Sequence, residues 1–260
     1  GIETRGVKVF VQPVKEYRFL LVLRGEGLED DIDDTDPQET GVPPLAPTAR
    51  DPKAKDTAKR VAEFLDQVSE RLKDQHPANM ALLRGFAQKP DWPAFNDVFS
   101  VNAAAIAAYP MYRGVAKLVG MNALDAGGSI DEELATLSRE WENYSFLYLH
   151  IKPTDKAGED GDFNGKVKLI EEIDGRLPEI LDAKPDVLVL TGDHSTPARM
   201  KSHSWHPVPV LLHSALARPD SVETFGERPC ACGGLGPRYP ARSLLPLAVA
   251  HAGGLEKFGA

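Results

Sequence analysis

The sequence has little cysteine and no long apolar run. Cys230 and Cys232, its two cysteines, are one residue apart, which is too close for an ordinary disulfide and too few thiolates for a zinc site. We therefore expect free thiols in a reducing compartment. No stretch approaches the roughly 20 apolar residues of a transmembrane helix, and no charged-then-apolar leader opens the chain. These absences predict a cytoplasmic protein with no membrane partner.

Positive charge is also in the minority. Lys and Arg together number 30 against 39 Asp and Glu, so the formal net charge is -9. A general nucleic-acid-binding protein needs a basic face for its phosphate contacts, so this balance argues against one. A small anionic substrate stays compatible with the sequence if metal ions and a few arginines reverse the sign locally.

The pattern of the chain changes near Pro90 and Pro93, which predicts a boundary between residues 1–92 and 93–260. The first region reads as a small α+β lobe, with two strand candidates, one amphipathic helix from Thr57 and a brief strand at 79–85. Its acidic, proline-rich stretch over 28–49 cannot bury a core of its own, so we expect a surface loop there. Calcium binding is disfavoured because the regular ligand spacing is missing.

The second region alternates strands and helices, the pattern of a mostly parallel sheet with helices packed on it. Ser129 and Glu132 have the spacing of a capping box, which predicts a helix start. Three short apolar runs, at 146–151, 187–191 and 207–212, are each bordered by polar residues. The middle run is predicted to be a buried parallel strand. Ligands collect beyond the carboxyl ends of such strands, so the polar residues there are candidate ligands.

Five of these side chains are candidate metal ligands: Asp155, Glu159, Asp193, His194 and His203. Mixed carboxylate and imidazole ligands suit manganese, zinc and similar ions, and two such ions form a clamp used for phosphoryl transfer. Each piece alone is commonplace, since an Asp-His pair can cap a surface loop and a lone histidine is often a hydrogen-bonded structural residue. Three pieces at strand ends together favour a metal site.

The same segments carry a family resemblance. Residues 150–158 (HIKPTDKAG), 191–197 (TGDHSTP) and 203–210 (HSWHPVPV) resemble the archaeal-type 2,3-bisphosphoglycerate-independent phosphoglycerate mutases of the alkaline phosphatase superfamily. The similarity runs through nearly the whole chain. It implies an α/β fold with an alkaline-phosphatase-like, mostly parallel sheet and helices on both faces, plus a smaller α+β insertion lobe. Residues 1–92 would be the lobe, closing as a lid, and 93–260 the C-terminal part of the core.

The resemblance also implies two divalent metal ions, most often manganese, with magnesium, zinc or cobalt as other options. Asp155, Glu159 and His203 would hold one ion, and Asp193 and His194 the other. Glu159 stands where the superfamily pattern has histidine, and its added negative charge favours a harder ion such as magnesium.

The implied activity interconverts 3-phosphoglycerate and 2-phosphoglycerate through a phosphoserine intermediate. Relatives supply the serine and the first aspartate ligand from an N-terminal segment that this sequence lacks. We therefore expect no catalytic nucleophile among these residues, the missing segment as their partner, and no turnover by this chain alone.

Arg84 and Arg113 are candidates for binding the phosphoglycerate, because a guanidinium fork matches phosphate and carboxylate. Ordinary surface pairing is the alternative for both. Lys152 and Lys166 either approach a phosphate or are solvated, and Trp205 is expected to pack against His203. Two other functions stay open: a metal-dependent phosphatase or other phosphoester hydrolase of the same superfamily, and a catalytically silent metal-binding chain.

Overall fold

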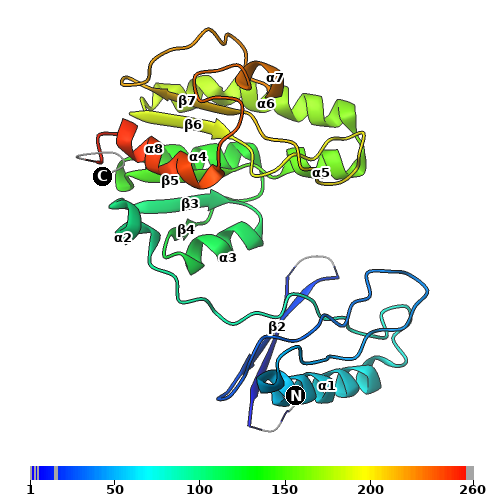
Figure 1. Ribbon diagram of the computed structural model, residues 1–260. Coiled ribbons are helices and arrows are strands. Elements are labelled where there is room, and N and C mark those ends of the chain that lie inside the picture. The colour runs from blue at the N-terminus through cyan, green and yellow to red at the C-terminus, as the bar shows by residue number, and fades with distance from the viewer. Residues whose placement is uncertain (1, 3, 5, 15–16, 256–260) are drawn as a thin grey trace. The chain divides into compact units, whose positions relative to one another are not determined.

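The computed structural model of the protein describes residues 2, 4, 6–14 and 17–255 (Figure 1). The chain folds into two compact units, Gly1–Asp91 and Trp92–Ala260. That the first unit is a lid inserted into a longer protein stays a prediction. None of the helices in the described part of the chain has the length and hydropathy that a bilayer crossing requires.

The first unit consists of a two-stranded sheet, a long loop and one helix. β1 (Lys8–Pro13) pairs in antiparallel fashion with β2 (Phe19–Arg24) along its whole length. α1 (Lys55–Leu72) carries an apolar stripe at helical spacing, and this stripe is buried against the sheet. A two-stranded sheet is marginally stable by itself, so the packing of α1 stabilises this unit.

One prediction for the first unit is wrong. Residues 79–85 form no strand; Leu83 instead binds Thr35, whose hydroxyl accepts from the Leu83 amide and whose amide donates to the Leu83 carbonyl, both at 2.8 Å. The acidic stretch lies mostly at the surface, as predicted, but Ile32 joins the core cluster that contains α1, and Ile32 and Thr35 are both 0% exposed. These two buried residues hold the loop in place, and their backbone amides also form hydrogen bonds.

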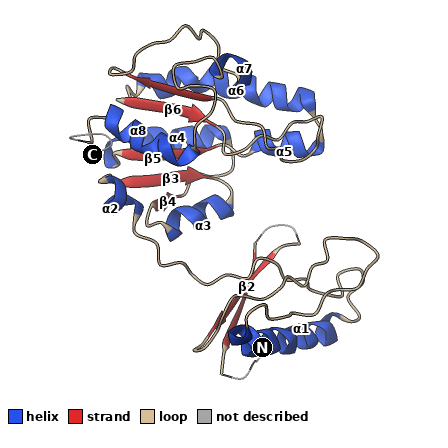
Figure 2. Cartoon of the chain, viewed as in Figure 1, coloured by secondary structure: helices blue, strands red, loops and turns tan. Residues whose placement is uncertain are grey.

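The second unit combines a parallel sheet, an antiparallel strand pair and seven helices within the described residues (Figure 2). The strands are β3 (Ala103–Ala107), β4 (Asn122–Leu124), β5 (Phe146–His150), β6 (Val187–Thr191) and β7 (Val210–Ser214). The helices are α2 (Phe95–Phe99), α3 (Pro110–Leu118), α4 (Ile130–Glu140), α5 (Pro153–Asp160), α6 (Phe163–Asp182), α7 (Glu227–Cys230) and α8 (Leu244–His251).

β3 is the centre of the second unit, because it lies between β4 and β5 and all five of its side chains are 0% exposed. Side chains alternate between the two faces of a strand. Ile106 therefore packs with Leu134 and Leu137 of α4, while Ala103 and Ala105 pack with Ala116 of α3 on the other face. Helices thus cover both faces of the parallel sheet, as predicted.

Two details of this unit test the sequence patterns. The capping box at the start of α4 is confirmed, since the Ser129 hydroxyl accepts from the Glu132 amide and Glu132 Oε2 accepts from the Ser129 amide. The prediction of a parallel strand at Val187–Thr191 is wrong, because β6 pairs with β7 in antiparallel fashion. This reversal matters for the site, since it places the end of β6 beside the start of β7. Cys230 and Cys232 are free thiols, as expected.

Candidate metal centre

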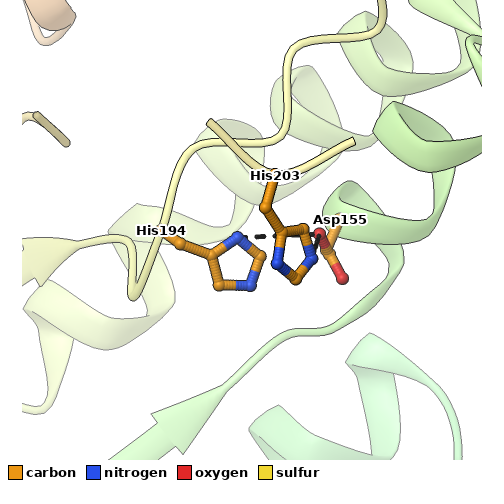
Figure 3. Close-up of side chains that lie close together, drawn as sticks. All are labelled: Asp155, His194 and His203. Atoms are coloured by element: carbon orange, nitrogen blue, oxygen red, sulfur yellow. Dashed lines mark ion pairs between the residues drawn. The ribbon is translucent and has the colours of Figure 1, made fainter. Parts of the chain in front are cut away.

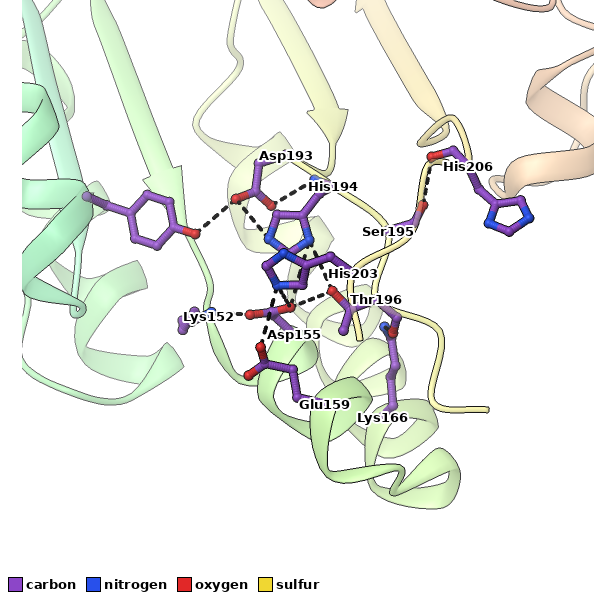
Figure 4. Close-up of polar contacts among 11 residues, drawn as sticks. Lys152, Asp155, Glu159, Lys166, Asp193, His194, Ser195, Thr196, His203 and His206 are labelled. Atoms are coloured by element: carbon purple, nitrogen blue, oxygen red, sulfur yellow. Dashed lines mark hydrogen bonds and ion pairs between the residues drawn. The ribbon is translucent and has the colours of Figure 1, made fainter. Parts of the chain in front are cut away.

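α5 presents two carboxylates on one face. β5 ends at His150, and α5 begins at Pro153, a residue suited to the first helical turn. Asp155 and Glu159 are four residues apart on this helix, so helical periodicity stacks them one turn apart. Figure 4 shows both side chains extending from the helix toward His203.

The loop between β6 and β7 supplies the imidazoles. Asp193 and His194 follow β6 after Gly192, and the chain then turns back on itself through an isolated antiparallel bridge between Ser195 and Ser204. The Ser204 amide donates to the Ser195 carbonyl at 2.9 Å. This bridge brings His203 beside His194, with ring centroids 3.9 Å apart and planes inclined by 32° (Figure 3).

The ligand atoms surround a common space. Asp155, His194 and His203 each offer an atom within 4.8 Å of the other two. His203 Nε2 is 3.6 Å from Asp155 Oδ1 and 3.5 Å from Glu159 Oε1, and His194 Nε2 is 3.6 Å from Asp193 Oδ2. These separations are long for hydrogen bonds. Two ligands that each lie about 2.0–2.2 Å from one ion stand about 3.3–3.6 Å apart at tetrahedral angles, so the donor set fits divalent metal.

Asp155 is the most enclosed of the candidate carboxylates, with 11% of its side chain exposed. Lys152 contacts its Oδ2, and the Thr196 hydroxyl donates to its Oδ1 at 2.5 Å. Burial raises the pKa of the Asp155 carboxyl, but the hydrogen bonds from Lys152 and Thr196 and the charge of Lys152 outweigh burial and leave this pKa below its usual value. Asp155 is therefore an anion at neutral pH.

Asp193 is more open, with 44% of its side chain exposed. Its Oδ2 accepts from the Tyr112 hydroxyl at 2.9 Å and its Oδ1 from the His194 amide at 3.1 Å. The Tyr112 ring stacks on His150 with centroids 3.6 Å apart. Burial, and then the hydrogen bond to Asp193, raise the pKa of Tyr112 above its ordinary value, so its hydroxyl keeps its proton and remains the donor.

Comparison with known proteins agrees with this geometry. A model of the metalloenzyme superfamily matches residues 19–237. The chain belongs to the metalloenzyme superfamily. A Thermosipho africanus protein named as a probable 2,3-bisphosphoglycerate-independent phosphoglycerate mutase is 49% identical over 258 residues, which are 99% of this chain and 64% of the relative. A Thermotoga maritima protein of the same name is 48% identical over 98% of this chain and 63% of its own length. The chain thus spans less than two thirds of the length of either relative.

Solved structures share the fold of this chain. A Pyrococcus horikoshii protein superposes with a TM-score of 0.73 at 32% identity, over 80% of this chain and 60% of that one. The cofactor-independent phosphoglycerate mutase of Thermoplasma acidophilum gives a TM-score of 0.67 at 24% identity, over 96% of this chain and 67% of that one. The predicted fold class and the predicted family resemblance are both confirmed.

The two candidate arginines, Arg84 and Arg113, each have a carboxylate partner. Arg113 on α3 lies 3.7 Å from Asp125, and Arg84 lies 3.5 Å from Asp36 within the first unit. These are the surface pairings that the sequence allowed as an alternative. A role for either arginine in binding substrate stays a prediction.

Other residues near the metal centre depart from their sequence-based expectations. Lys152 and Lys166 are engaged rather than simply solvated, since Lys152 contacts Asp155 and Lys166 Nζ donates to the Thr196 carbonyl at 2.7 Å (Figure 4). Trp205 was expected to pack against His203. It is instead 79% exposed and stacks on the neighbouring His206, with centroids 5.1 Å apart.

Sequence reasoning missed two residues that hold the ligands in place. Tyr112 is 81 positions away from Asp193, and no local pattern connects the two. Thr196 lies only two residues after His194, within the motif at 191–197, so its nearness was visible but its contact with Asp155 was not. Both residues donate a hydroxyl to a ligand carboxylate, which is the usual outer support of a metal site.

Proposed function

We propose that this metalloenzyme chain is part of a 2,3-bisphosphoglycerate-independent phosphoglycerate mutase that interconverts 3-phosphoglycerate and 2-phosphoglycerate. The observation that carries the proposal is the approach of α5, the residues after β6 and His203 to one space. The names of the curated relatives support the same activity. A cytoplasmic location, inferred from the free thiols, belongs to this proposal.

We infer two divalent ions at this centre. Asp155, Glu159 and His203 would hold one, and Asp193 with His194 would hold the other. Bound ions of this kind neutralise charge on a phosphoryl group and activate an attacking oxygen. Manganese is the ion to test first, because carboxylates and imidazoles together suit it, and magnesium is next because Glu159 adds a hard oxygen ligand.

The residues of this chain would prepare the site rather than carry the phosphoryl group. Lys152 places an ammonium group beside Asp155, and its end lies over the Tyr109 ring at 5.7 Å. Tyr112 holds Asp193 by a hydrogen bond. Arg113 and Arg84 are the proposed contacts for the substrate phosphate and carboxylate. The serine nucleophile is proposed to lie in the part of the relatives that this chain does not cover.

The proposed function is tested by identifying the products that contain the substrate's phosphate group. The full-length protein and this chain are each incubated with 3-phosphoglycerate and manganese, and products are identified by phosphorus NMR. The proposal predicts 2-phosphoglycerate from the full-length protein and none from this chain alone. Inorganic phosphate as the main product would instead indicate a phosphoester hydrolase, and no reaction by the full-length protein would favour a silent metal-binding protein.

Two histidine variants make the functional test specific. His203→Ala in the full-length protein should abolish product formation, because it removes a proposed ligand. His213→Ala is the matched control, since His213 lies in β7, away from the ligand cluster. Equal loss of activity in both variants would contradict a role for the metal centre.

A further inference from the structure

His194 faces both groups of ligands at once. Its Nδ1 lies 3.9 Å from Asp155 Oδ1, and its Nε2 lies 3.6 Å from Asp193 Oδ2. A neutral imidazole carries a proton on one nitrogen and a lone pair on the other, so only one of its nitrogens can bind a metal. The position of that proton decides whether His194 can bind the ion of Asp155 or the ion of Asp193.

The hydroxyl group of Thr196 affects which nitrogen of His194 carries the proton. Its hydroxyl oxygen is 2.5 Å from Asp155 Oδ1 and 3.0 Å from His194 Nδ1. A hydroxyl has one proton to give, and a carboxylate can only accept. The Thr196 proton therefore goes to Asp155, and its lone pair is left to accept from His194. That acceptance requires a proton on Nδ1 of the ring.

Thr196 has little freedom to make any other contact. It is 3% exposed, and its carbonyl accepts from Lys166 Nζ at 2.7 Å. The backbone of α5 approaches so closely that a Cβ on Gly158 would lie 2.2 Å from the Thr196 carbonyl oxygen. A β-branched side chain in such surroundings has few rotamers, so its hydroxyl stays between Asp155 and His194.

We propose that Thr196 is a positioning residue that holds His194 in the tautomer protonated on Nδ1. The free Nε2 of His194 then joins Asp193, and His194 is withheld from the ion of Asp155 and His203. The distances agree, because Nε2 is 3.6 Å from Asp193, as expected for two ligands of one ion, whereas the Nδ1 separation of 3.9 Å is the longest of these four pairs. The inference rests on the proposed two-ion centre, yet the tautomer exists without metal.

The direct test observes the tautomer in the metal-free 260-residue chain. Histidine labelled with nitrogen-15 is read by NMR at a pH of about 8, where an ordinary imidazole is neutral. The His194 signals are the set that disappears in His194→Gln. We expect protonated Nδ1 and unprotonated Nε2. A proton on Nε2 in the wild-type protein would overturn the proposal, whatever any variant shows.

Two substitutions at Thr196 separate its hydroxyl from its shape. Thr196→Val keeps the branched side chain and removes the hydroxyl, and it should move the His194 proton from Nδ1 toward Nε2. Thr196→Ser keeps the hydroxyl and should keep the wild-type tautomer. A residue that served only for packing would give the reverse order, with Val close to wild type and Ser perturbed.

Manganese binding provides the second measurement, by calorimetry on the same chain. Thr196→Val should weaken both ions by about 10–100-fold, because the hydroxyl supports Asp155 directly and His194 through its tautomer. In an Asp193→Asn background only the loss at the Asp155 ion should remain, because the second ion is already gone. If Thr196→Val leaves the affinity of the Asp193 ion unchanged in the otherwise wild-type chain, the assignment of His194 to Asp193 is wrong. If wild-type protein binds no manganese, the proposed function fails, while the tautomer result still judges Thr196.

Discussion

The two halves of the proposed metal centre differ in how firmly the protein holds them. The Asp155 half consists of Asp155, Glu159 and His203, and its central carboxylate is 11% exposed and bound by Lys152 and Thr196. The Asp193 half consists of Asp193 and His194, and its carboxylate is 44% exposed. The Tyr112 hydroxyl donates a hydrogen bond to this carboxylate.

This difference indicates which side chains are already held in position before a metal ion binds. Ligands that are already placed lose less freedom on binding, and three ligands hold an ion better than two. We therefore expect the Asp155 half to bind its ion more tightly. The Asp193 half needs outer support from Tyr112 and Thr196, and it should respond more strongly when that support is removed.

The largest effect should come from the buried carboxylate. Asp155→Asn removes the anion on which the first half is built, and we expect the tighter manganese ion to weaken by more than about a hundredfold, since losing only an outer partner costs about 10–100-fold. Asp193→Asn should spare that ion. The measurement is calorimetric titration of this chain, with the 90% exposed Asp125→Asn as control. Retention of the tighter ion by Asp155→Asn would reverse the ranking of the halves.

A steric change should damage the Asp155 half without touching a ligand. Gly158→Ala places a Cβ 2.2 Å from the Thr196 carbonyl, so α5 or its neighbour must shift. Overpacking of this kind costs about 1–3 kcal/mol of unfolding free energy, measured by denaturant titration. Gly175→Ala in α6 is the control, because nothing lies within 4 Å of its Cβ and the change should stabilise the helix. Equal stability of both variants would show that the close approach is not needed.

Loss of the outer support should affect the Asp193 half alone. Tyr112→Phe keeps the ring on His150 and removes the hydroxyl that binds Asp193. The weaker manganese ion should lose about tenfold in affinity, and the tighter ion should be unaffected. Tyr148→Phe is the control, because the described contacts include no hydrogen bond from Tyr148 to Asp193. A matching loss at both ions would mean that the two halves are not independently supported.

The smallest effect concerns Glu133, which binds the backbone just before α3, the helix that contains Tyr112. Glu133 is 3% exposed, and its Oε1 accepts from the amide of Ala108, just before α3. Burial raises the pKa of Glu133, against a smaller opposing effect of that hydrogen bond. A raised pKa in the folded state means that this carboxyl favours folding at low pH and that its contribution is lost as pH rises through the folded pKa.

Glu133→Gln keeps a hydrogen-bond acceptor for the Ala108 amide and removes the ionisable carboxyl group. Thermal unfolding at several pH values should therefore show the variant becoming more stable relative to wild type as the pH rises above about 4.3, the ordinary pKa of glutamate. Parallel stability curves would show that Glu133 ionises in the folded protein as easily as in the unfolded one.

The sequence predicted those parts of the structure that depend on local pattern. The capping box of α4, the stripe of α1 and the positions of the candidate ligands after β5 and β6 each follow from residues close together in the chain. The candidate ligands could be named because carboxylates and imidazoles at strand ends are an unusual combination.

Features that depend on residues far apart in the chain could not be predicted from the sequence. The direction of β6 is set by β7, and a short apolar run has the same pattern in parallel and antiparallel pairs. Ile32 lies in an acidic, proline-rich loop and is still fully buried, because α1 covers it. Tyr112 reaches Asp193 only through the packing of α3 beside β3 and β5.

The most direct test of the centre is a crystal of this chain soaked in manganese and measured at a wavelength where manganese scatters anomalously. We predict two peaks, one bonded to Asp155 and His203 and one bonded to Asp193 and to Nε2 of His194. A single peak that joins Nδ1 of His194 to Asp155 and His203, or no peak at these residues, would contradict the account.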